Sequence, residues 1–269
     1  MRRLLIASLV TAGLVGTVLI AGTVFSGDIS GEPDDILIYE ANANVPGRPS
    51  VTLDDQFIDA LFRVKKLDGL GVPTKKTPFG GYGYEPEHLD FHYATYKVKT
   101  RAKVGKVNVT VTDQFGTRLI QVKRQKPDRL LVPAFKAPGV TAPTPPTITQ
   151  LEDNKIDHYL CYRIKLLDGG FTEVNVTVDD QFTNNKTIVV KKPKKLCAPV
   201  NKLHPSVGVF PINNDDGISG PHLMCYKVKL KGPKNPKATV ALGDQFITTK
   251  IKIDTRKPKE LCVPAEKVP

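Results

Sequence analysis

One segment pattern occurs four times in this chain, and the repetition constrains the fold more than any other feature. Each copy has an alternating segment that contains a tyrosine, then the tripeptide Asp-Gln-Phe, then a short segment that ends near a proline. The copies span residues 36–76, 92–136, 158–202 and 222–267 and are called copies one to four below. The nearly constant spacing of these landmarks indicates tandem repeats of one supersecondary unit.

Each copy has the pattern of β-strands. Val107, Val109 and Val111 alternate with polar residues, and Ile251 and Ile253 alternate with lysines. A period of two is typical of strands with one buried and one solvated face, and no segment after residue 25 has a sustained helical period. We therefore expect an all-β protein built from tandem four-stranded antiparallel repeats.

The domain organisation follows from the size of a copy and from one linker. A copy is a thin basis for an independent core, so its sheet needs a partner. Residues 137–157 begin with a proline-rich stretch that is typical of an extended spacer. We expect two β-sandwich or barrel-like domains at residues 30–136 and 158–269, each made of two copies. A string of four separate units and a single four-bladed ring are the alternatives.

The N-terminus has the composition of an export segment. Arg2 and Arg3 precede an uncharged, apolar stretch at residues 4–25. A positive region followed by an apolar region is typical of a secretory signal peptide, while the length of the apolar stretch also suits a retained membrane anchor. We expect residues 1–26 to form a signal or anchor helix. The rest of the chain would then be extracytoplasmic, either secreted or attached to the cell envelope.

The chain carries a formal net charge of +12. A cationic exported protein meets anionic partners such as acidic polysaccharides or lipid headgroups. The alternation of the first strand in copies two, three and four places basic side chains on its outward face. We expect a possible anion-binding surface there, with an ordinary solvated face as the alternative. These residues are Lys97, Lys99, Arg163, Lys165, Lys227 and Lys229.

The four cysteines occupy matching places in copies three and four, one in the first strand and one in the closing strand. Copies one and two lack both. Cysteines that are present or absent together indicate a covalent pair within one copy, and an exported location favours oxidation. We predict the disulfides Cys161–Cys197 and Cys225–Cys262.

A metal site is the alternative role for these cysteines. His158 and His222 each stand three residues before a cysteine. In a strand, however, residues three apart point to opposite faces. His92 also remains in copy two, where the cysteines are missing. We therefore expect no metal site and no cofactor.

The Asp-Gln-Phe tripeptide ends a predicted strand in every copy. We expect its aspartate to accept backbone N–H bonds from the following turn and its phenylalanine to lie in the core. Calcium binding is the alternative, but a neighbouring acid occurs only at Asp54 and Asp179. No catalytic motif occurs in the chain, so we expect a protein that is not an enzyme. The four aspartates are Asp55, Asp113, Asp180 and Asp244.

The motifs HYLCYRIK, DQF and LCAPVNK, with HLMCYKVK and LCVPAEK, resemble a family of exported prokaryotic repeat proteins that carries the label of a domain of unknown function. The resemblance covers residues 158–267 well and 92–136 in part, while copy one departs from it. It implies a secreted β module and no chemistry. We expect an exported, non-catalytic β-repeat protein with a structural, adhesive or ligand-binding role at the cell surface. Binding of anionic polymers through the basic faces is the alternative.

Overall fold

The computed structural model describes most of the chain after the N-terminal segment. The predicted signal or anchor helix at residues 1–26 lies outside the described residues. Within them, no helix has the length and apolar character needed to cross a membrane. The described ranges are 33–77, 85–123, 127–139, 141–213 and 221–268.

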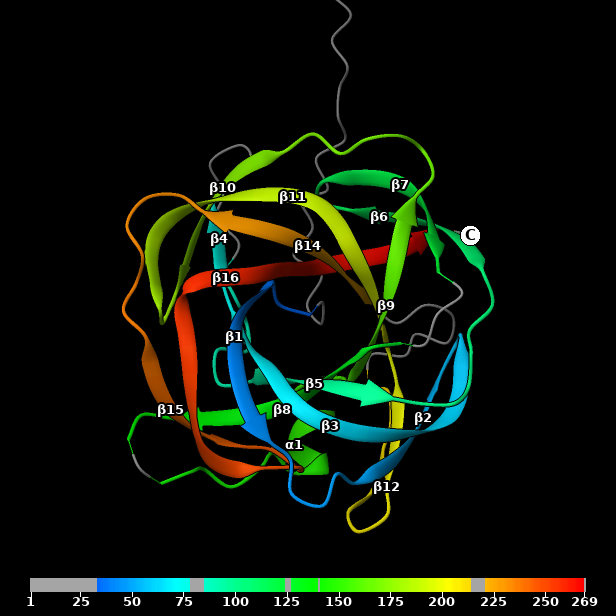
Figure 1. Ribbon diagram of the computed structural model, residues 1–269, viewed down its shortest axis with the longest axis vertical. Coiled ribbons are helices and arrows are strands. Elements are labelled where there is room, and N and C mark those ends of the chain that lie inside the picture. Colours follow the sequence, from blue (N-terminus) through cyan, green and yellow to red (C-terminus); the bar gives the residue numbers. More distant parts are fainter. Residues whose placement is uncertain (1–32, 78–84, 124–126, 140, 214–220, 269) are drawn as a thin grey trace, which may run out of the picture.

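The protein is all-β and has one large antiparallel sheet, which confirms the all-β, antiparallel part of the prediction (Figure 1). The strands of copies one and two are β1 (Ile36–Asn44), β2 (Ser50–Asp55), β3 (Ile58–Pro73), β4 (Lys75–Thr77), β5 (His92–Lys99), β6 (Val107–Asp113), β7 (Gly116–Val122) and β8 (Arg129–Ala137). After α1 (Ile148–Asp153) come β9 (Tyr159–Leu166), β10 (Val174–Asp180), β11 (Thr183–Pro199), β12 (Asn201–His204), β13 (Gly208–Phe210), β14 (His222–Leu230), β15 (Ala238–Gly243) and β16 (Thr248–Val268).

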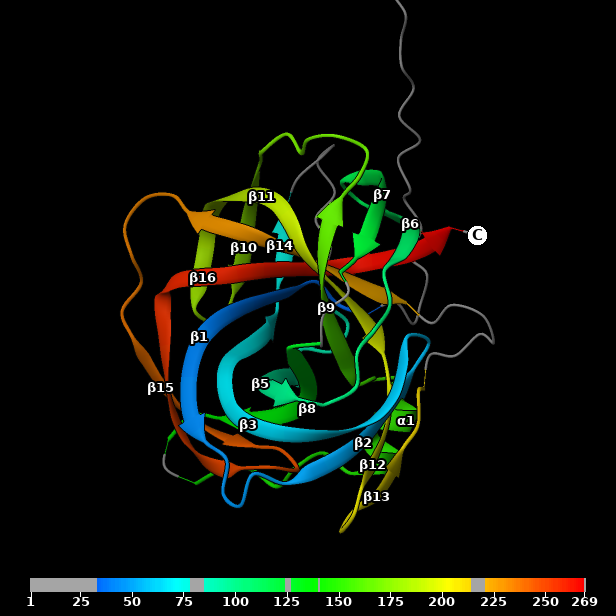
Figure 2. The ribbon, with the colours of Figure 1, turned by 45° about the vertical axis from the view of Figure 1, so that its right-hand side comes forward.

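Eight of these strands form a closed ring, called the ring below. Each copy contributes its first strand and its closing strand. Pairing runs from β1 through β3, β5, β8, β9, β11, β14 and β16 and returns to β1. Figures 1 and 2 show these strands around a common centre. All neighbours in the ring are antiparallel, so β1, β5, β9 and β14 run in the same direction.

The remaining strands form hairpins outside the ring, and their pairing joins copies that are two apart in the sequence. β4, which follows the closing strand of copy one, pairs with β10 of copy three. β12 of copy three pairs with β2 of copy one. In the same way, the end of β16 pairs with β6 and the end of β8 pairs with β15.

Two hydrophobic clusters lie on the two faces of the ring because strand side chains alternate in direction. Ile36 and Ile38 belong to the inner cluster with all four cysteines, whereas Leu37 and Tyr39 belong to the outer cluster beneath the hairpins. Both clusters contain side chains from all four copies. The core is therefore shared by the whole chain.

This arrangement differs from the expected division into domains at residues 30–136 and 158–269. β1 of the first half pairs with β16 of the second half over six aligned residue pairs, and β8 pairs with β9 directly across the linker. The sheet therefore does not divide at the proline-rich stretch. The physical reason is that a ring leaves none of its eight strands with an unpaired edge.

The linker itself contains α1, which the search for helical periodicity did not find. Six residues are too few to display a period. The signal was its capping box, in which the Thr147 side chain accepts from the backbone of Gln150 and the Gln150 side chain accepts from the backbone of Thr147. Leu151 of α1 is buried in the inner cluster, so the helix covers one end of the ring.

Candidate anion-binding site

The landmarks of the four copies meet each other in space. The tyrosine of each first strand donates a hydrogen bond to the aspartate of an Asp-Gln-Phe tripeptide two copies away. The pairs are Tyr39–Asp180 at 2.8 Å, Tyr96–Asp244 at 2.5 Å, Tyr162–Asp55 at 2.7 Å, and Tyr226–Asp113. The neighbouring phenylalanine packs edge-on against the same tyrosine in each case.

The same aspartates accept backbone N–H bonds from the turn that follows them, which confirms the predicted turn capping. Asp55, for example, accepts from Phe57 at 2.8 Å and from Ile58 at 3.1 Å. Burial raises the pKa of all four carboxyl groups to about 6, although the tyrosine and backbone donors oppose the rise. These groups are committed to contacts within the protein and hold the copies together.

The glutamine of each tripeptide contacts the residue four positions before the tyrosine of the preceding copy. Gln181 meets His92 at 2.6 Å and Gln245 meets His158 at 2.7 Å. Burial lowers the pKa of His92 to about 4 and that of His158 well below its usual value. Both histidines are therefore neutral structural residues, and sequence reasoning had found no role for them.

The predicted disulfides Cys161–Cys197 and Cys225–Cys262 both form, each between directly paired residues of neighbouring strands. The two disulfides touch, because the sulfurs of Cys197 and Cys225 are 3.6 Å apart. Cys225, Cys262 and Glu260 also group closely enough to hold a metal ion. The disulfide and the two cations on Glu260 described next already engage these atoms.

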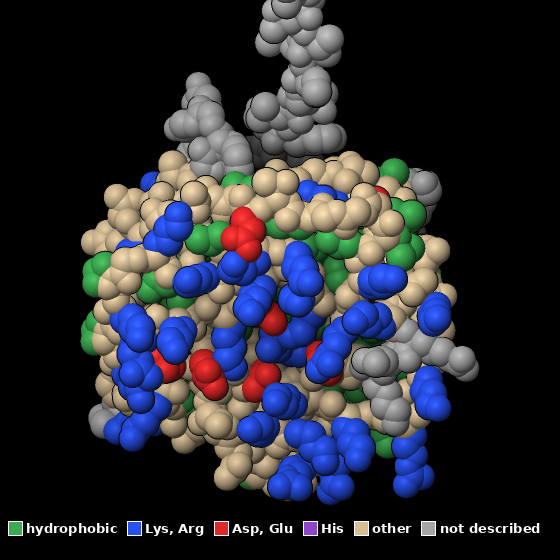
Figure 3. All heavy atoms as spheres, turned by 45° about the horizontal axis from the view of Figure 1, so that its top comes forward, with side chains coloured by type: hydrophobic (Ala, Val, Ile, Leu, Met, Phe, Trp, Pro, Cys, Tyr) green, Lys and Arg blue, Asp and Glu red, His purple; other side chains and the backbone are tan. Residues whose placement is uncertain are grey.

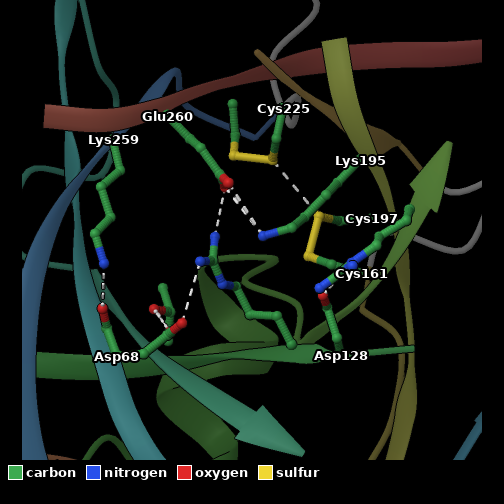
Figure 4. A network of polar contacts seen from close by, with 12 residues as sticks. Asp68, Asp128, Cys161, Lys195, Cys197, Cys225, Lys259 and Glu260 are labelled. Carbon is green, nitrogen blue, oxygen red and sulfur yellow. Dashed lines mark hydrogen bonds and ion pairs between the residues drawn. A yellow bond between two sulfur atoms is a disulfide. The ribbon is translucent and has the colours of Figure 1, made fainter. Parts of the chain in front are cut away.

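Inside the ring, beside the disulfides, lies a cluster of charged residues called the ionic cluster (Figure 4). Arg129 binds Glu260 and also Asp68 at 3.3 Å, and Lys195 binds Glu260 at 3.1 Å. Each of these side chains is at most 14% exposed. Burial alone would raise the pKa of Glu260, but Arg129 and Lys195 outweigh burial and hold that pKa below its usual value. The two cations thus favour the ionised form of Glu260, while burial and the charge of Arg129 lower the pKa of Lys195.

Around the ionic cluster, one end of the ring carries exposed and half-buried cations, called the basic rim. Its members come from the last residues of β5, β9 and β14 and from the facing parts of β3 and β11. They lie at one end because the three first strands run in the same direction. Figure 3 shows a face on which Lys and Arg side chains gather. The basic rim comprises Arg63, Lys66, Lys97, Lys99, Arg163, Lys165, Lys192, Lys194, Lys227 and Lys229.

Several cations of the basic rim face another cation in the neighbouring strand. Arg63 is directly opposite Lys99, and Lys66 is directly opposite Lys97. Like charges in directly opposed positions destabilise a sheet. Cations thus stand where the fold alone would favour neutral or acidic side chains.

A second group of cations gathers around Lys194. Partial burial lowers the pKa of Lys194, and the positive charges of Lys192, Lys227 and Lys123 lower it further. Arg163 lies opposite Lys195 and pairs with Asp128 at 2.7 Å. The basic rim is therefore only partly neutralised within the protein.

The structure places all six predicted basic residues in the basic rim and exposes each of them. Lys97, Lys99, Arg163 and Lys227 lie beside further cations, whereas Lys165 lies opposite Gln121 and Lys229 opposite Val189. The sequence analysis missed the rim members that lie within the closing strands β3 and β11: Arg63, Lys66, Lys192 and Lys194. The basic run Lys191–Lys195 was the signal that could have found two of them.

No family model, no curated protein and no solved structure matches this chain.

Proposed function

We propose that this protein is an exported, non-catalytic β-repeat protein whose basic rim binds anionic polymers. The observation that carries the proposal is the direct opposition of Arg63 with Lys99 and of Lys66 with Lys97 in the sheet. This arrangement costs folding stability, and a bound polyanion would offset the repulsion by placing negative charge between the strands.

The ligand class follows from the shape of the basic rim. The cations are spread over five strands around one end of the ring. A distributed surface suits a repeating anion, such as an acidic polysaccharide, better than a small compact one. A planar lipid surface presents the same chemistry in another form, so the experiment includes both.

Export and the repeat organisation belong to the same proposal. Both disulfides are compatible with an extracytoplasmic location, because such bonds persist in oxidising compartments. The recurrence of the tyrosine–aspartate contact in every copy supports a fourfold repeat.

The proposal is tested by measuring the affinity for labelled heparin and for vesicles with anionic lipid. A variant carrying Arg63→Gln, Lys66→Gln, Lys97→Gln and Lys99→Gln should bind about a thousandfold more weakly at low salt, since each cation near an anionic surface contributes about 1 kcal/mol. The loss should shrink as salt is added.

The matched control variant removes four exposed lysines elsewhere, by Lys234→Gln, Lys237→Gln, Lys250→Gln and Lys252→Gln. Both variants lose the same net charge, so a general charge effect would weaken them equally. Equal affinities of the two variants for heparin and for the vesicles would refute the basic rim as the binding surface. Loss of heparin binding with unchanged vesicle binding, or the reverse, identifies which anionic surface is recognised.

A further inference from the structure

Copy one differs from the other copies at one position that faces a buried lysine. In copy three the lysine three residues after the closing proline, Lys202, meets His158 at 2.8 Å. In copy one the equivalent lysine, Lys76, meets Asp35, where copies two to four have histidine. A carboxyl group can acylate an amine, whereas a histidine side chain has no acyl group to transfer. Only copy one therefore pairs this lysine with a group able to form an amide.

We propose that Lys76 and Asp35 join covalently, by an isopeptide bond between Nζ of the lysine and Cγ of the aspartate. Their side chains are in contact and are 3% and 2% exposed, respectively. Contact between two reacting groups held in place raises their effective concentration greatly. Exclusion of water protects the product from hydrolysis.

The surroundings of the pair suit the reaction. Burial raises the pKa of Asp35, because desolvation disfavours the ionised form of its carboxyl group, although the nearby charge of Lys76 opposes the rise. Gln114 donates a hydrogen bond to the other oxygen of Asp35 at 3.2 Å. That donor is placed to stabilise the oxyanion that forms when the amine attacks the carboxyl carbon.

The proton balance closes within the pair itself. In the reaction the unprotonated amine of Lys76 attacks Cγ of the protonated Asp35 carboxyl group. A proton then passes from the nitrogen to the leaving hydroxyl, which departs as water. One C–N bond forms, one C–O bond breaks, one water is released, and no other reactant is needed.

The other buried lysine–carboxylate pair of the described chain shows why the environment matters. Glu260 binds Lys195 and Arg129 together, and these two cations hold the pKa of Glu260 below its usual value. Its carboxyl group therefore stays ionised and does not react with an amine. Asp35 contacts one cation, and burial dominates its pKa.

The bond would take the place of the disulfides in copy one. It would join residues 41 positions apart, and the disulfides of copies three and four join residues 36 and 37 positions apart. In all three copies the link ties the start of the first strand region to the closing strand or the segment just after it.

Mass spectrometry of the full chain, unfolded and with its disulfides reduced, tests the proposal. The wild-type protein should weigh one water less than its sequence, and digestion should release one branched peptide that contains both Asp35 and Lys76. Asp35→His, which copies the arrangement of copy three, and Lys76→Arg should each restore the full mass. Circular dichroism verifies that both variants remain folded.

The Lys202 peptide is the internal control and should stay unbranched in every sample. Folded wild-type protein that keeps its full mass after long incubation at acidic and neutral pH would overturn the proposal.

Discussion

Asp55 shows how one side chain can cap its own turn and connect two copies. One carboxylate oxygen accepts the backbone N–H bonds of Phe57 and Ile58, and the other accepts the hydroxyl of Tyr162 from copy three. The turn could be predicted from Asp-Gln-Phe because local side-chain bonding is encoded locally. The tyrosine partner lies 107 residues away, and no local pattern encodes such a contact.

Replacement of Asp55 by asparagine should change how stability depends on pH. Burial raises the pKa of Asp55 from 3.8 to about 6, so between these values the native state binds more protons than the unfolded state. The contribution of Asp55 to stability is therefore largest at acidic pH and falls as pH rises through 6. Asparagine does not ionise but keeps an oxygen for Phe57 and Ile58. From acidic to neutral pH, Asp55→Asn should gain up to about 3 kcal/mol relative to the wild type.

Urea unfolding at several pH values measures this difference. Asp54→Asn is the matched control, because Asp54 is the exposed neighbour in the same strand. It should change the pH dependence far less than Asp55→Asn, because the charge of Asp54 is the smallest cause of the raised pKa of Asp55. A constant offset between Asp55→Asn and the wild type at all pH values would contradict the prediction.

At the scale of the strands, the closing strands make the contacts that were hardest to predict from the sequence. Arg129, Lys195 and Glu260 occupy the same position relative to the closing proline in copies two, three and four, and Gly69 occupies it in copy one. Read separately, each looks like a surface residue of an alternating strand. Only closure of the ring brings three of them together inside it. The disulfides were predictable because a cysteine forms this bond only with another cysteine, whereas a charged residue has many possible partners.

Removal of the shared anion from the ionic cluster should be costly. Glu260→Gln leaves Arg129 and Lys195 buried without their common partner, and loss of one member of a buried ion pair costs about 3 to 5 kcal/mol. Guanidinium unfolding measures the loss. The control Glu173→Gln breaks the more exposed pair with Lys191 and should cost less than about 1 kcal/mol. Similar losses in the two variants would contradict a structural role for the cluster.

At the scale of the whole molecule, the ring explains why the alternation of each strand was predictable and the assembly was not. The period of two fixes which side chains share a face, but it does not say which strand comes next. The proline-rich stretch favoured a boundary that the β8–β9 pairing crosses. The observed ring takes two strands from each copy, which matches none of the arrangements expected from the sequence.

The first half of the chain should not fold alone. Residues 33–136 would leave the outer edge of β1 without β16, and they would leave Asp55 and Asp113 without Tyr162 and Tyr226. We expect this fragment to give the narrow amide dispersion of an unfolded chain in NMR spectra and to be digested rapidly by protease. The fragment 33–268 should be folded and resistant. A folded 33–136 fragment would instead establish two independent domains.

The pairing of β1 with β16 also sets the order in which the molecule can form. The ribosome makes the first strand of the ring long before the last, so one edge of β1 has no partner until synthesis is almost complete. The contacts between β1 and β16 join residues near opposite ends of the chain. Contacts between residues so far apart in the sequence slow folding. A polypeptide with this topology remains incompletely folded while it is being synthesised or passed through a translocation channel. The ring can close only when β16, the last strand, is present.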